Sequence, residues 1–224
     1  MSTARAASII LAKELRLELR TRELLNATLI FALIVIVMFS YAFDPTSAES
    51  RRYGPGLLWI AFLFAGSLML HPSFAREQSN ETLDALRLAP ISNFAILLGK
   101  MAANFIFLAA AELVLVPIFA VLYNLPVASV AGRLVLVLAL GTAGLVVAGT
   151  VFAAITAHSR MRELMLPLLL LPVLAPLLVA AVEATASLLN DAPALDRSWV
   201  AFLAAFDIVF MTASWLVCDF LLEE

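Results

Sequence analysis

The sequence predicts an all-α, polytopic membrane protein with six transmembrane helices. Hydrophobic residues fill 63% of the 224 positions and charged residues only 14%, which leaves too little polar surface for a soluble domain. A membrane-spanning helix needs about 20 apolar residues, so the chain length accommodates about six spans and their connections. We therefore expect one transmembrane domain over residues 1–224, with no separate globular domain.

Residues 1–25 are expected to form an amphipathic helix in the membrane interface, ahead of the first span. The stretch KELRLELR alternates with a period of two, which is typical of a strand. Its Leu, Lys, Glu and Arg residues are nevertheless strong helix formers, and a lone strand at a membrane would have unpaired edges. Glu18 and Arg22 are spaced for a supporting ion pair. A solvated helix is the alternative. The acidic residues argue against a signal peptide, so we expect the first span to be retained.

The spans are expected at six apolar runs, 26–43, 56–73, 97–123, 134–157, 164–188 and 199–222. Residues 26–73 then hold spans one and two, 74–93 form a cytoplasmic loop, and 94–222 hold spans three to six. Lys and Arg concentrate on the cytoplasmic side of membrane proteins. With a cytoplasmic N-terminus, ten of them lie inside and four outside. The inside set is Arg5, Lys13, Arg16, Arg20, Arg22, Arg76, Arg87, Lys100, Arg160 and Arg162, and the outside set is Arg51, Arg52, Arg133 and Arg197. Both termini are therefore expected in the cytoplasm.

Acidic residues inside the expected spans are the first candidates for function. Glu112 falls near mid-membrane, Asp207 about a third of the way in, and Glu183 near the outer end. Such acids are costly in a membrane and mark a pathway, a proton relay or a paired contact. Because no Lys or Arg lies at their depth, we expect each to be protonated or hydrogen-bonded, for instance to Asn104, Thr142 or Thr150.

Pro167, Pro172 and Pro176 interrupt the fifth expected span. Each proline leaves the carbonyl four residues earlier without its usual donor, which a helix packed against neighbours or a cavity tolerates best. The prolines can form either a static kink or a bendable element of a cycling transporter, and both interpretations stay open.

In the fourth span, Gly141 and Gly144 indicate close helix packing.

The sequence holds no recognisable catalytic or metal motif. His71 and His158 lie far apart in the sequence, both at the expected cytoplasmic side, and Cys218 is the single cysteine. A net charge of -3 argues against nucleic acid as a partner. We expect no catalytic site and no bound metal, and an intramembrane enzyme built on Glu112 or Asp207 is the least favoured alternative.

The stretch FAREQSNETLDALRLAP, residues 74–90, predicts a short cytoplasmic helix. Asn80 can cap a helix over 81–89, which Pro90 would end. Leu83 and Leu86 share one face of that helix. Such a face either rests on the membrane or docks in the groove of a soluble partner.

These stretches together resemble the CcmB (haem exporter protein B) family, the permease subunits of the cytochrome c maturation ABC transporter. The resemblance covers nearly the whole chain in order, through AKELRLELRTRE, GPGLLWIAFLFAG, FAREQSNETLDALRLAP, LLGKMAANFIFL, RELMLPLLLLPVLAPLLVAAVEAT and the terminal FDIVF and LEE.

The resemblance implies an ABC-2-like permease in the bacterial cytoplasmic (inner) membrane. It implies a partner ATPase, CcmA, which binds ATP and grips the cytoplasmic coupling helix between the second and third spans. The coupling residues would be Glu77, Glu81, Leu83, Asp84, Leu86 and Arg87. CcmC, CcmD and the haem chaperone CcmE would be companions, with two copies of this chain per complex.

The resemblance also implies that the complex handles haem and that this chain binds no cofactor directly. ATP hydrolysis would drive haem delivery or release of the haem-loaded chaperone. Whether this chain moves haem itself or only transmits force stays open, and an ABC-2 permease for a lipid, glycan or drug is the alternative function.

Overall fold

The computed structural model describes residues 2–42, 48–70, 72–74, 91–125, 127–156, 162–189 and 195–223. Within these ranges the regular elements are α-helices, as the sequence predicted. Their bounds are α1 Thr3–Thr21, α2 Glu23–Ala42, α3 Ala48–Leu70, α6 Asn93–Leu122, α7 Val127–Thr156, α8 Arg162–Leu189 and α9 Arg197–Glu223.

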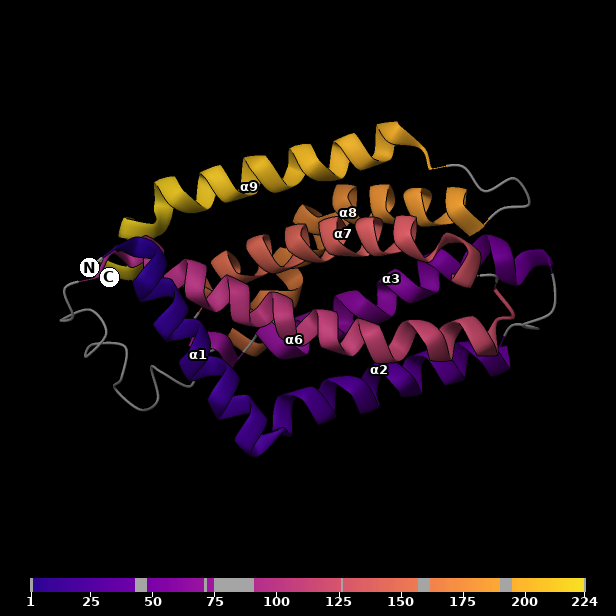
Figure 1. Ribbon diagram of the computed structural model, residues 1–224, viewed down its shortest axis with the longest axis horizontal. Coiled ribbons are helices and arrows are strands. Elements are labelled where there is room, and N and C mark those ends of the chain that lie inside the picture. The colour runs from indigo at the N-terminus through magenta and orange to yellow at the C-terminus, as the bar shows by residue number, and fades with distance from the viewer. Residues whose placement is uncertain are drawn as a thin grey trace.

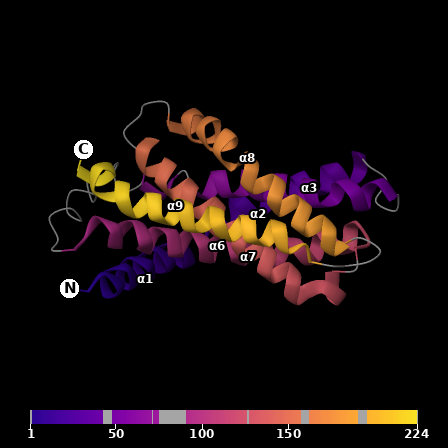
Figure 2. The ribbon, with the colours of Figure 1, turned by 90° about the horizontal axis from the view of Figure 1, so that it is seen from above.

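Six of the described helices, α2, α3, α6, α7, α8 and α9, are long and apolar enough to cross a membrane, which confirms the expected polytopic fold. They run roughly side by side along the long axis of the molecule, with α2 and α9 on opposite sides (Figure 1). The chain's two ends lie at the same end of this bundle in both views (Figures 1 and 2). With six spans, an even number, the chain ends on the same side of the bundle as it began.

Helix α7 forms the centre of the bundle and packs against α3, α6, α8 and α9. In its most apolar stretch 67% of the residues are buried, against 17% for α2 and 11% for α9. Small residues on α7 allow this crowding, because a Cβ on Gly141 would lie 2.2 Å from the Trp59 ring and one on Gly149 would lie 2.3 Å from Leu70. The packing role expected for the small residues of this span is confirmed.

Helix α1 is inclined to the spans and packs mainly against α6, at the end of the bundle where both termini lie (Figure 1). It ends at Arg22, whose φ of 53° is left-handed and whose N–H donates to the Glu18 carbonyl at 2.6 Å. The buried Glu18 side chain accepts a 2.8 Å hydrogen bond from the Leu25 N–H and so caps α2. The boundary between the two helices is therefore Arg22, whereas the sequence placed it after Leu25.

All six spans begin earlier than their apolar runs suggested, and α3 and α7 do so by the most. Helix α3 starts at Ala48 and contains Pro55, although residues 44–55 were expected to be a connection. Helix α7 starts at Val127 instead of 134. Hydrophobicity marks only the part of a helix that lies in the membrane, whereas backbone hydrogen bonding can continue the helix beyond that part. Ser92 caps α6 through its side chain, which accepts from the Ala95 N–H at 3.3 Å, and this signal was missed.

Candidate functional site

The acid at mid-membrane, Glu112, is buried between two spans. Its residue is only 5% exposed, on α6, and the Thr142 hydroxyl of α7 hydrogen-bonds to its carboxyl group. Thr142 is one of the three partners that the sequence suggested. The other two, Asn104 and Thr150, hydrogen-bond to each other instead, at 3.1 Å. Glu112 therefore joins α6 to α7 as a paired contact.

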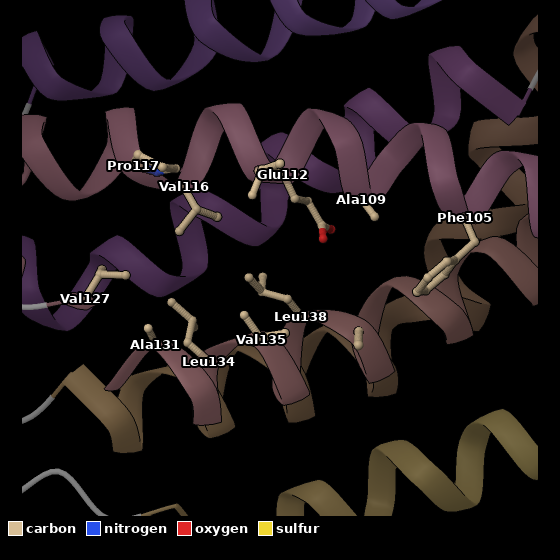
Figure 3. A pocket seen from close by; sticks show the side chains of 12 residues that line it. Phe105, Ala109, Glu112, Val116, Pro117, Val127, Ala131, Leu134, Val135 and Leu138 are labelled. Carbon is tan, nitrogen blue, oxygen red and sulfur yellow. The ribbon is translucent and has the colours of Figure 1, made fainter. Parts of the chain in front are cut away.

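A groove of about 440 Å³ opens beside this contact, between α6 and α7. Glu112 forms part of its wall, and the other lining residues are apolar, among them Phe105, Val116 and Leu138. The Glu112 carboxyl points into the gap between the two helices (Figure 3). The groove offers one carboxyl group in an otherwise apolar lining, which suits an apolar chain or helix.

Asp207, on α9, packs against the opposite side of the same part of α7. A Cβ on Gly144 would lie 2.7 Å from Asp207 Oδ1 and 2.7 Å from Leu177 Cδ1, so a larger residue there would force these side chains to shift. Within the described part of the chain, this oxygen is buried and has no hydrogen-bond partner. Thr142 and Gly144 are two residues apart on α7, which is about 200° around a helix axis. Glu112 and Asp207 are therefore separated by α7 and do not form one site.

Glu183, on α8, is exposed and does not join either of the other acids in a buried pair. Two residues further along α8, the buried Thr185 hydroxyl accepts a 3.0 Å hydrogen bond from the Trp59 indole N–H of α3. Among the residues that the structure describes, no group of three or more His, Cys, Asp or Glu side chains is arranged to hold a metal ion.

The three prolines lie within α8, as the sequence predicted. Pro172 and Pro176 are exposed and Pro167 is half-buried. Helix α8 packs against α3, α7 and α9, as expected of a helix that tolerates prolines, while the rings of Pro172 and Pro176 face outward. The apolar side chains that α8 buries against the bundle include Leu170, Leu174 and Leu177.

The expected coupling residues lie outside the described residues. These are Glu77, Glu81, Leu83, Asp84, Leu86 and Arg87, and both histidines, His71 and His158, are outside them as well. The structure describes the chain up to Phe74 on one side of this segment and from Ile91 on the other.

Comparison with known proteins adds the evolutionary context. The chain matches the CcmB protein family over residues 5–219, from α1 into the last turns of α9. The Heme exporter protein B of Pseudomonas aeruginosa is 33% identical over 199 residues, which covers 88% of this chain and 89% of that protein. The proteins of the same name from Rhodobacter capsulatus and Paracoccus denitrificans are 34% and 31% identical, over 78% and 89% of this chain and 79% and 90% of their own lengths. With a family match across all the spanning helices, the chain belongs to the CcmB family of transporter permease subunits.

Proposed function

We propose that this chain is the membrane permease subunit of an ABC transporter complex for cytochrome c maturation. In that role it couples ATP hydrolysis by a partner ATPase to haem delivery or to release of the haem-loaded chaperone. The observation that carries the proposal is the family match over residues 5–219, together with relatives named Heme exporter protein B along most of the chain. The chain itself is a permease subunit and not an enzyme, so ATP is bound by the partner.

We infer that the chain lies in the bacterial inner membrane with both ends in the cytoplasm. The Lys and Arg distribution supports this orientation, because ten of these residues fall on the side of the termini and four on the other. The structure's six candidate spans are compatible with it, since the two chain ends lie at one end of the bundle. In this orientation α1 lies at the cytoplasmic surface and the loop after α3 faces the ATPase.

The ATPase, CcmA, would dock on the loop over residues 74–93. Leu83 and Leu86 would enter a groove of the ATPase, with Asp84 and Arg87 on another face of the short helix and Glu77 and Glu81 beside its start. CcmC, CcmD and CcmE complete the complex, with two copies of this chain. The permease would pass the motion of the ATPase to its partners without binding haem itself.

The test is complementation together with co-purification. An affinity-tagged copy of this chain is expressed in a bacterium that lacks its own CcmB-family protein, and membranes are solubilised in mild detergent. Restored holo-cytochrome c, with CcmA co-purifying, is the expected result. Recovery of a different ATPase, with no restored cytochrome c, would instead indicate an ABC-2 exporter of a lipid, glycan or drug.

A further inference from the structure

A lysine is buried at the end of the bundle where the two termini lie. Lys100, on α6, is 1% exposed. Its Nζ lies 3.3 Å from Glu14 Oε1 of α1 and donates a hydrogen bond to the backbone carbonyl of Ser73. The same Nζ lies 4.7 Å from the centre of the Phe74 ring. A buried ammonium group is costly unless it is paired, and here a carboxylate, a carbonyl and an aromatic ring surround it.

One helical turn further along α6, Asn104 holds the same serine through its side chain. Its Nδ2 donates to Ser73 Oγ at 3.2 Å and to Thr150 Oγ1 at 3.1 Å. Residues four apart on a helix lie on one face, so Lys100 and Asn104 both hydrogen-bond to Ser73. Lys100 binds the backbone carbonyl of Ser73, and Asn104 binds its side-chain hydroxyl. Through Thr150 the same contact reaches α7.

Helix α1 is brought into this cluster by a glycine. A Cβ on Gly99 would lie 2.9 Å from the Ala7 carbonyl oxygen and 2.8 Å from the Ile10 Cβ. Only glycine allows the backbone of α1 to approach α6 this closely. The close approach places Glu14, further along α1, against Lys100.

Ser73 and Phe74 are the last described residues before the segment over 75–90. The carbonyl that Lys100 binds therefore lies two residues before that segment, at a point that we call the base of the loop. A cation at helix-end carbonyls is favourable. The cluster of Glu14, Ser73, Lys100, Asn104 and Thr150 thus ties the base of the loop to α1, α6 and α7 at once.

We propose that Lys100 is a positioning residue that fixes the base of the cytoplasmic loop to α1 and α6, so that motion of the loop moves these helices. The proposal rests on the proposed function, in which the ATPase acts on that loop. Without the ammonium group, the loop would still follow α3 in the chain, but its base would no longer be held to α6. ATP hydrolysis would then continue with less work passed to the permease.

The test compares Lys100→Met with Lys13→Met in the assembled complex. Methionine keeps the apolar stem of Lys100 and removes its charge. Lys13 is a matched control, because its Nζ lies 3.4 Å from the same Glu14 oxygen while its side chain is 45% exposed. Three quantities are measured for each variant: CcmA recovered per tagged permease, ATP hydrolysed per complex, and holo-cytochrome c formed per ATP.

With Lys100→Met, CcmA recovery and ATP hydrolysis are expected to stay near wild type, while holo-cytochrome c per ATP falls about tenfold, the size expected for a hydrogen bond to a charged group. Lys13→Met should leave all three unchanged. A ratio of cytochrome c to ATP that is unchanged in Lys100→Met complexes would overturn the proposal, even if fewer complexes assemble, because that pattern describes a purely structural residue.

A second variant decides the question should Lys100→Met fail to accumulate. Glu14→Gln keeps the size of the partner and removes its charge, so it should lower holo-cytochrome c per ATP, whereas Lys13→Met should not. Equal ratios for Glu14→Gln and Lys13→Met would refute the role. If wild-type chain neither recovers CcmA nor restores cytochrome c, it is the proposed function that fails, and that outcome is separate from these ratios.

Discussion

Thr142 on α7 hydrogen-bonds to the carboxyl group of Glu112 on α6, and both residues are buried. An isolated charge at this depth would be expensive, whereas a hydrogen bond between two helices satisfies both polar groups. The contact also borders the apolar groove between the same helices (Figure 3). The geometry favours a packing role for Glu112 over a proton relay, because Asp207 is separated from it by α7.

Substitution of Glu112 separates packing from proton transfer. Glu112→Gln keeps a hydrogen-bonding group of similar shape and is expected to leave both stability and cytochrome c yield close to wild type. Glu112→Leu removes the contact with Thr142 and should lower stability by roughly 0.6–2 kcal/mol, as for other hydrogen bonds between membrane helices. Thermal unfolding in detergent and holo-cytochrome c yield measure the two effects.

Thr142→Val is the matched change on the other helix, and it should destabilise about as much as Glu112→Leu. The double variant should cost little more than either single change, since the residues share one contact. A Glu112→Gln protein that is stable and bound to its ATPase but makes no holo-cytochrome c would show instead that Glu112 is a functional site.

Gly141 should be the most sensitive glycine of α7. In a Gly141→Ala protein the new Cβ would lie 2.2 Å from the Trp59 ring, which is itself held by its hydrogen bond to Thr185. Overpacking of this kind costs about 1–3 kcal/mol, and thermal unfolding should report it. Gly132→Ala is the control on the same helix, because nothing lies within 4 Å of its added Cβ. Equal stability of the two variants would contradict this packing.

The orientation of the spans can be mapped with fusions to alkaline phosphatase, which is active only outside the cytoplasm. Activity is expected for fusions after Pro45, Leu125 and Ala192, and no activity for fusions after Ala85, Ser159 and Glu223. The excess of Lys and Arg at the expected cytoplasmic side is the physical reason. Green fluorescent protein, which is fluorescent in the cytoplasm, should give the opposite pattern. Phosphatase activity after Ala85 or Ser159 would show that the orientation is wrong.

Neither histidine is expected to ligate haem. His71 and His158 both fall at the side that the Lys and Arg distribution places in the cytoplasm. A protein with His71→Ala and His158→Ala should therefore support cytochrome c assembly, and the haem absorption spectrum of the purified complex should be unchanged. Each single substitution serves as the control. A Soret band that is lost or shifted by either change would assign that histidine a role in haem binding.

Hydrophobicity was sufficient to predict the number and order of the spans, because each needs a long apolar run. It could not give their ends. Helices α3 and α7 begin at Ala48 and Val127, well before their apolar runs, because a helix can extend beyond the part that lies in lipid. The period-two pattern of residues 13–20 also proved compatible with a helix, since helix propensity and packing against α6 outweigh the alternation.

Side-chain partners were harder to predict than spans. Thr142 could be named as one of three partners for Glu112, but the choice depends on how α6 and α7 are rotated against each other. Lys100 was counted only as a positive charge on the cytoplasmic side. Its burial against Glu14 and Ser73 depends on contacts between segments far apart in the sequence, which a single sequence does not reveal. The spacing of Lys100 and Asn104 on one helix face was the available signal.

The coupling role of residues 74–93 is tested most directly at Leu83 and Leu86. In the assembled complex both are replaced by Asp, which would remove apolar burial of about 1.5–3 kcal/mol per side chain and place charges in the groove of the ATPase. A chain with both replaced by Met keeps the apolar contact and is the control. The measurement is the amount of CcmA recovered per tagged permease, with holo-cytochrome c scored in the same cells. The account predicts that the Asp variant inserts normally but loses CcmA and holo-cytochrome c, while the Met variant keeps both. Unchanged recovery of CcmA with the Asp variant would contradict it and would mean that this segment only rests on the membrane.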